Sequence, residues 1–139
     1  MKHIACGLLF DKNGKLLIYL RDNKPNIPFP NYWDLFGGHV EEDEIPEQAF
    51  VRETEEEIGY TLSLNEIHHF RDYNVQTGDA YPNIKHIYWA RLKADVSELH
   101  LGEDGQELRA ISLDERRQYA FANILLSIID DFVLADMDY

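Results

Sequence analysis

The sequence has one cysteine, few basic residues and no apolar run long enough to cross a membrane. Cys6 has no partner for an internal disulfide, and its place in the apolar segment 4–10 predicts a buried structural thiol. No small-residue cleavage site follows that segment, so we expect neither a signal peptide nor a membrane anchor. We therefore expect a cytoplasmic protein that needs no oxidising compartment.

Acidic side chains outnumber basic ones two to one. The chain has 26 aspartates and glutamates against 13 lysines and arginines, a formal net charge of -13. This charge repels the phosphate backbone of DNA and RNA and attracts metal cations, so we expect no nucleic-acid polymer among the partners. A phosphate-cradling P-loop and a dinucleotide-binding fingerprint are also absent, which argues against a kinase or a dehydrogenase.

The globular composition and the length predict one domain over residues 1–139. The sequence of the N-terminal half predicts a β-hairpin, in which the pair Asn13-Gly14 favours the positive φ angles of the turn. A loop with three prolines follows, and then a short aromatic strand that ends at a Gly37-Gly38 turn. The predicted elements of this half are strands 4–10 and 15–20, loop 22–31, strand 32–36 and helix 45–58.

The C-terminal half predicts further strands and a final helical region. Apolar residues recur at helical spacing between Ile124 and Val133. The predicted elements are strands 62–73 and 84–92, loop 93–105, strand 107–112 and a mostly helical segment from residue 113. This order indicates an α+β fold in which helices pack on a mixed β-sheet.

An acidic stretch dominates the first predicted helix and the residues before it. Runs of this kind are often only solvated surface, but here Glu53, Glu56 and Glu57 share one arc of the helix, while Phe50 and Ile58 lie on another side. Like charges at this spacing repel each other, and a bound divalent cation would remove the repulsion. Hard cations such as Mg²⁺ or Mn²⁺ prefer oxygen ligands, so the spacing favours a metal site.

The segment 38–60 resembles the Nudix box, whose pattern is glycine, five residues, glutamate, seven residues and then Arg-Glu-aliphatic-x-Glu-Glu-x-Gly-aliphatic. All seven invariant-type positions of that pattern are matched, by Gly38, Glu44, Arg52, Glu53, Glu56, Glu57 and Gly59. Thr54 and Tyr60 stand where aliphatic residues are usual, and Phe36 stands before the box where proline is commoner. The departures at Thr54 and Tyr60 bear on stability more than on chemistry.

The resemblance implies the Nudix fold, an α/β/α sandwich, with a metal site built on a loop–helix–loop. The implied ligands of Mg²⁺ or Mn²⁺ are the carbonyl of Gly38 and the carboxylates of Glu53, Glu56 and Glu57. Arg52 matches the arginine whose ion pairs hold the glutamates in position, and we count it with them among the catalytic residues. Glu44 matches the remaining glutamate, a structural residue or a further ligand.

The base that accepts the proton of the attacking water has several candidates. The box helix offers Glu53 and Glu56. A second source is the segment 102–106, which resembles the Glu-Gly-Gln loop of mutator-type members and contains Glu103 and Asp104. Asp104 is one carbon shorter than the glutamate it replaces, and the alternative is that this segment is only a flexible polar loop.

Substrate-binding residues are less clearly marked. Asn123 lies in a segment that resembles the one whose asparagine reads the purine edge in mutator-type members, and an amide offers both a donor and an acceptor. It serves equally well as the N-cap of a helix that begins at Ile124. His39, beside the glycines, is a candidate phosphate contact. The aromatic residues that offer a stacking surface, or simply core packing, are Tyr32, Trp33, Tyr73, Tyr81, Tyr88 and Trp89.

These observations predict a Mg²⁺-dependent Nudix hydrolase that cleaves a nucleoside triphosphate, ordinary or oxidised such as 8-oxo-dGTP, by attack of water on phosphorus. The alternatives are hydrolysis of nucleotide sugars or dinucleoside polyphosphates, and a Nudix sensor that binds a nucleotide without cleaving it. The expected partner is a small nucleotide, and no membrane is expected. The chain is expected to be a monomer or a homodimer.

Overall fold

The computed structural model describes all 139 residues, and its central strand is β1 (Lys2–Phe10). This strand pairs in parallel with β6 (Asn83–Arg91) and antiparallel with β2 (Leu16–Leu20) and β4 (Phe36–His39). Strand β2 also pairs antiparallel with β3 (Trp33–Asp34) on one edge and with β7 (Glu107–Ile111) on the other, and β5 (His68–Val75) pairs antiparallel with β6. The result is a seven-stranded mixed sheet.

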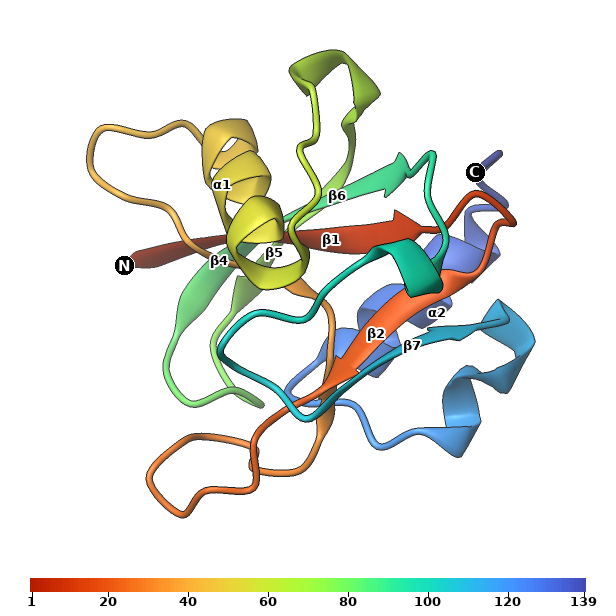
Figure 1. Ribbon diagram of the computed structural model, residues 1–139. Helices are drawn as coiled ribbons and strands as arrows, with labels where there is room; N and C mark the ends of the chain where they lie inside the picture. Colours follow the sequence, from red (N-terminus) through yellow and green to blue (C-terminus); the bar gives the residue numbers. More distant parts are fainter.

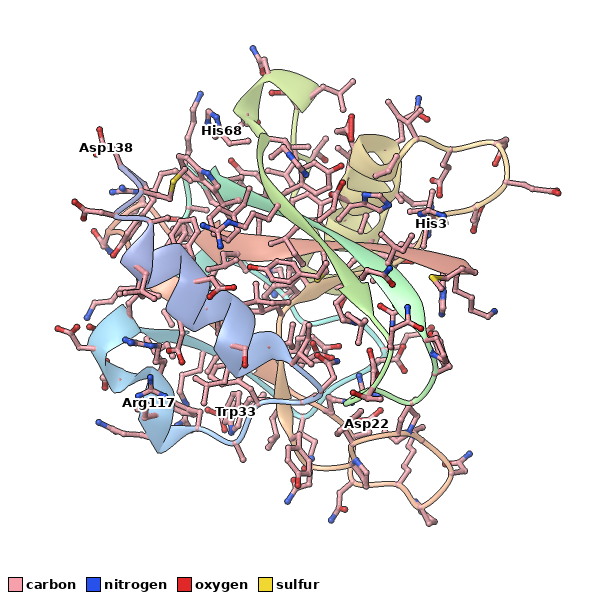
Figure 2. All side chains as sticks on the ribbon, turned by 180° about the vertical axis from the view of Figure 1, so that it is seen from behind. His3, Asp22, Trp33, His68, Arg117 and Asp138 are labelled. Atoms are coloured by element: carbon pink, nitrogen blue, oxygen red, sulfur yellow. The ribbon has the colours of Figure 1, made fainter.

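Both faces of this sheet are apolar and each is covered by one helix. Alternation along β1 directs Leu8 and Phe10 to one face and Ala5 and Leu9 to the other. Helix α1 (Pro46–Ile58) covers the second face and α2 (Leu125–Leu134) the first, so the helices lie on opposite sides in Figure 1 and in the reverse view of Figure 2. The α+β fold with a mixed sheet between helices is therefore confirmed.

Each helix buries a compact apolar stripe. In α2 the stripe consists of Leu125, Ile128, Ile129 and Phe132, and its burial stabilises the fold by roughly 2 kcal/mol for each large side chain. In α1 the buried apolar residues are Ala49, Phe50 and Ile58. Gly7 of β1 makes room for Phe50, because a Cβ atom there would lie 2.8 Å from the Phe50 ring. Neither helix has the length and apolarity needed to span a membrane.

The N-terminal hairpin forms as predicted, with one difference in its turn. Gly14 has a φ of 81°, whereas Asn13 does not have a positive φ. The side chain of Asp11 instead stabilises the turn, since its Oδ1 accepts hydrogen bonds from the backbone N–H groups of Asn13 and Lys15.

Three predicted elements have different limits. The aromatic strand 32–36 is two short strands, β3 and β4, and Gly37-Gly38 lies within β4 rather than in a turn. The strand expected at 62–73 begins only at His68, after the short 3₁₀-helix Leu64–Glu66. A second such helix, Val96–Glu98, interrupts the loop predicted at 93–105.

The C-terminal segment is less helical than predicted. A 3₁₀-helix, Leu113–Gln118, is separated from α2 by six residues without helix. That gap pairs with the sheet, since the N–H of Trp33 donates to Ala120 O at 2.8 Å and the N–H of Ala122 donates to Trp33 O at 2.9 Å. Pairing with a strand that is distant in sequence interrupts the helix, and periodicity does not reveal such a contact.

Candidate functional site

Helix α1 presents its glutamates to the two glycines of β4. A Cβ atom on Gly38 would lie 2.5 Å from the carboxyl carbon of Glu53, so only glycine admits this side chain against the strand. The N–H of Gly37 donates to Glu57 Oε1 at 3.0 Å. Ala49 is fully buried in the same helix, which leaves room for this close approach. The two glycines therefore allow Glu53 and Glu57 to lie directly against β4.

Arg52, on α1, forms hydrogen bonds with residues before the helix and with Glu53 on the helix itself. Its guanidinium donates from Nε and Nη2 to the two carboxylate oxygens of Glu44, at 2.8 and 2.9 Å. Nη1 donates to Glu53 Oε1 at 2.9 Å, and Nη2 also donates to the carbonyl of His39 at 3.0 Å. The arginine, assisted by the N–H of Glu41, lowers the pKa of Glu44 to about 2. Arg52 therefore connects Glu44 with Glu53 through charge-assisted hydrogen bonds.

The carboxylates line one hollow of about 560 Å³ beside α1. It is lined by Tyr19, Gly37, Glu53, Glu56, Glu57, Gly102, Glu103 and Asp104, and none of these side chains is basic. Burial raises the pKa of Glu57 to about 9, and the nearby negative charges of Glu53, Asp34 and Asp104 add to the effect. Burial also raises the pKa of Glu53, against the opposing influence of Arg52.

A divalent cation fits this set of donors. Hard cations take carboxylate and carbonyl oxygens, and a cation would relieve both the repulsion and the cost of burying the charge on Glu57. The side chains do not form a ready-made shell, because no group of three acidic, histidine or cysteine side chains converges closely enough to hold an ion. Glu53 instead accepts a hydrogen bond from Arg52, and Glu57 accepts one from the N–H of Gly37.

The loop with Glu103 and Asp104 is anchored to the end of α1. The N–H of Gly102 donates to Glu57 O at 2.8 Å, and a Cβ atom on Gly102 would lie 2.6 Å from Glu56 O. At its other end, the N–H of Gly105 donates at 3.1 Å to the side chain of Asp22, which is labelled in Figure 2. These contacts hold the loop acids at the same hollow as the glutamates of the box.

A second, smaller hollow of about 280 Å³ adjoins the first, and Tyr19 and Gly37 line both. Two ion pairs contribute to its walls: Arg21 with Asp34 and Lys85 with Asp79, at 2.8 and 2.7 Å. Burial raises the pKa of Asp34 despite the influence of Arg21. The sequence prediction missed these four residues. The one available signal is Lys85, a charged residue at a position of β6 whose neighbours Ile87 and Trp89 face the core.

The two predicted substrate contacts both lie at the smaller hollow. Asn123 has a φ of 43°, and its Oδ1 accepts from the N–H of Ile124 at 2.6 Å. The expectation that Asn123 caps the final helix is wrong, because Ile124 occupies the N-cap of α2. His39 is bound through Nε2 to the hydroxyl of Tyr81 at 2.8 Å. Among the aromatic residues proposed for stacking, Tyr81 alone lines this hollow.

The departures from the box pattern concern packing. Thr54 is completely buried at its aliphatic position, and its hydroxyl has no hydrogen-bond partner. Tyr60 packs at the edge of the α1 core, and its hydroxyl accepts from the N–H of Lys93 at 3.2 Å. Cys6 is a buried free thiol, as predicted, and burial raises its pKa to about 12.

The fold, the glycine pair and the glutamate-bearing helix together define a domain of the Nudix type. The family model described as NUDIX domain matches residues 2–132, and the chain belongs to this family. Over 61 residues, 44% of the chain, it is 39% identical to an 8-oxo-dGTP diphosphatase of Proteus vulgaris. Over 64 residues, 46% of the chain, it is 41% identical to the nucleoside triphosphatase NudI of Escherichia coli.

These matches cover 53% and 44% of the two relatives, so the chain spans about half the length of the curated relatives it matches. Among solved structures, MutT from a study of Aliivibrio salmonicida and Vibrio cholerae is 26% identical, with a TM-score of 0.76 and coverage of 98% of both chains. The Nudix domain of Shewanella oneidensis NrtR, solved with ADP ribose, has a TM-score of 0.80 at 20% identity, over 97% of this chain and 88% of that one. The latter likeness supports the fold.

Proposed function

We propose that the chain is a pyrophosphohydrolase that depends on Mg²⁺ or Mn²⁺ and cleaves a nucleoside triphosphate or a related nucleoside diphosphate derivative. The observation that carries this proposal is the adjacency of two hollows. One gathers the carboxylates of Glu53, Glu56 and Glu57, and the other has the size and polarity for a base. A nucleotide that spans both would place its phosphates beside the acidic hollow.

In this proposal Glu53, Glu56, Glu57 and the Gly38 carbonyl would hold the cation. When bound, the cation neutralises phosphate charge and lowers the pKa of water. Arg52 keeps Glu53 in place through its bond at 2.9 Å, and the N–H of Gly37 orients Glu57.

A carboxylate beside the attacking water accepts its proton as the water oxygen bonds to phosphorus. The bridging P–O bond of the anhydride breaks, and its oxygen leaves with the other phosphate-bearing product. Glu53, Glu56, Glu103 and Asp104 all line the acidic hollow and are the candidates for this base.

The relatives support a nucleotide substrate. One is an 8-oxo-dGTP diphosphatase and another a nucleoside triphosphatase, which favours a triphosphate, ordinary or oxidised. Nucleotide sugars and dinucleoside polyphosphates are the competing substrates. Measurement of kcat/KM for a panel of compounds from all these classes will rank the substrates. A nucleotide sugar with a higher kcat/KM than every triphosphate would contradict the proposed substrate class.

The metal assignment is tested by Glu57→Gln. Glutamine can still accept from the Gly37 N–H, so we expect an intact fold by circular dichroism but loss of Mg²⁺-dependent phosphate or pyrophosphate release. The matched control is Glu55→Gln, the same chemical change at an exposed position outside the hollow, where activity should persist. Undiminished turnover in Glu57→Gln would contradict the assignment.

A further inference from the structure

Lys85 is a buried cation with unused hydrogen-bond donors. Its side chain is 3% exposed and lies at the smaller hollow, on the face of β6 that also carries Ile87. The ammonium donates to Asp79 Oδ2 at 2.7 Å, which uses one of its three N–H groups. No other acceptor in the protein bonds to it. A buried donor without a partner is costly, and a ligand in the hollow can satisfy it.

Both carboxylates that line this hollow already accept hydrogen bonds. Asp79 accepts from Lys85, from Asn83 Nδ2 at 3.1 Å and from the Ala80 N–H at 2.7 Å. Asp34 accepts from Arg21 and from the N–H of the next residue. A ligand in this hollow therefore meets two carboxylates that already have donors and an ammonium, that of Lys85, whose donors are only partly used.

Asn123 adds to these unused donors. Its Oδ1 already accepts from the N–H of the next residue, and its amide NH₂ has no protein partner. A ligand that uses both groups would present two acceptors, one to Lys85 and one to Asn123.

The hollow suits a neutral base more than a phosphate. The two aspartates balance the charges of Lys85 and Arg21, so the walls carry no excess positive charge. Its volume of about 280 Å³ is just below the range of about 300–1,000 Å³ typical of pockets for complete drug-sized ligands, and so favours a base alone. Phe29 and Tyr81 contribute aromatic surface for stacking.

Among the bases, guanine carries two neighbouring acceptors, O6 and N7. Adenine replaces O6 with an amino donor, cytosine presents an amino donor, and thymine has only O4 on the corresponding edge. In 8-oxoguanine N7 carries a hydrogen, and the two acceptors on this edge are O6 and O8. A purine with an oxygen at position 6 therefore complements the free donors best.

We propose that Lys85 is a specificity-determining residue that donates to the 6-oxo group of a purine, while the amide of Asn123 donates to the second acceptor on the same edge. This inference rests on the proposed nucleotide hydrolysis and narrows its substrates to 6-oxopurine nucleotides. It also alters the expectation for Asn123, since only the donor half of its amide is free.

The unaltered protein gives the first test, through two pairs of substrates that differ chiefly at position 6. We expect kcat/KM to be at least about tenfold higher for dGTP than for 2-amino-dATP, and for dITP than for dATP, because a well-formed base contact contributes about 1–3 kcal/mol. Equal values within both pairs, or dTTP equal to dGTP, would overturn the inference. Failure to hydrolyse any nucleotide with Mg²⁺ would instead overturn the proposed function.

A variant gives the second test. Lys85→Met keeps the length of the side chain but removes its donors, and combining it with Asp79→Asn avoids an unpaired buried carboxylate. We expect the ratio of kcat/KM for dGTP to kcat/KM for 2-amino-dATP to fall towards one. The cause should be a higher KM for dGTP, with kcat retained. The control Lys15→Met, at an exposed lysine, should keep the ratio of the unaltered protein. A double variant that folds and keeps its preference for dGTP would refute the role of Lys85.

Discussion

Arg52 is the residue on which the geometry of the box depends most. It binds Glu44 through two parallel hydrogen bonds, holds Glu53 and reaches the carbonyl of His39. A guanidinium has a planar fork of donors that suits this arrangement, and a lysine would not reproduce it. We therefore expect Glu44 to influence the position of Glu53 through Arg52.

Glu44→Gln tests this indirect role. Glutamine accepts more weakly from Arg52, so Glu53 should be less well held and kcat/KM should fall about ten- to hundredfold. Exposed Glu42→Gln is the control and should leave kcat/KM within about twofold of the unaltered protein. Equal activity of the two variants would contradict the positioning role.

The ion pair between Glu44 and Arg52 predicts a pH dependence of stability. The pKa of Glu44 is lowered from 4.5 to about 2 in the folded protein, so its ion pair contributes fully above pH 4.5 and is lost as the pH falls towards 2. The melting temperature of the unaltered protein should therefore fall more steeply with decreasing pH over this interval than the melting temperature of Glu44→Gln. The same dependence of melting temperature on pH in the two proteins would argue against a lowered pKa of Glu44.

Thr54 predicts a stabilising substitution. Its buried hydroxyl has no partner, so Thr54→Val, which preserves shape, should raise the free energy of unfolding by about 1 kcal/mol. Urea unfolding measures the change. Thr61→Val is the control, because the exposed hydroxyl of Thr61 already donates to Glu55, and no gain is expected there. A less stable Thr54→Val would show that this hydroxyl is satisfied in solution.

At the scale of elements, the important junction lies between the C-terminal end of α1 and the loop that carries Asp104. The loop donates its Gly102 N–H to Glu57 O, one of the carbonyls that a helix end leaves free. This contact satisfies the helix end and also brings the loop acids to the hollow. The position of Asp104 therefore depends on the backbone of the helix that carries the glutamates.

Gly102→Ala should disturb this junction selectively. Gly102 does not have a positive φ, so alanine suits the backbone, but its Cβ would lie 2.6 Å from Glu56 O and force the loop away. If a loop acid takes part in the reaction, kcat should fall about ten- to hundredfold while the melting temperature changes little. Full activity in this variant would place the base on the box helix instead.

At the scale of the whole molecule, the excess of acidic charge opposes compactness. A net charge of -13 on 139 residues repels itself, and salt screens that repulsion. The melting temperature at pH 7 should therefore rise as NaCl increases from about 0.05 to about 0.5 M. The control is the same series near pH 4.7, the isoelectric point, where the rise should vanish. A melting temperature that falls with salt at pH 7 would show that attractive ion pairs dominate.

The helices and strands were predicted correctly where interactions between residues close in sequence determine the structure. The hairpin and helix α1 follow from a turn, a proline near the start, a glycine after the end and side-chain periodicity, and all of these lie within a few residues of each other. It failed at residues 119–124, where pairing with Trp33 replaces the expected helix. That contact joins segments about 90 residues apart in sequence, and no local pattern encodes it.

The sequence alone determined the acidic half of the candidate site. Glu53, Glu56 and Glu57 share a side because helix geometry fixes the direction of residues three and four apart. Only the tertiary structure assembled the other half, in which β6 contributes Lys85, the loop before it contributes Asp79 and the segment before α2 contributes Asn123. Their proximity depends on the register of the sheet and on the docking of distant segments, and spacing along the chain does not specify either.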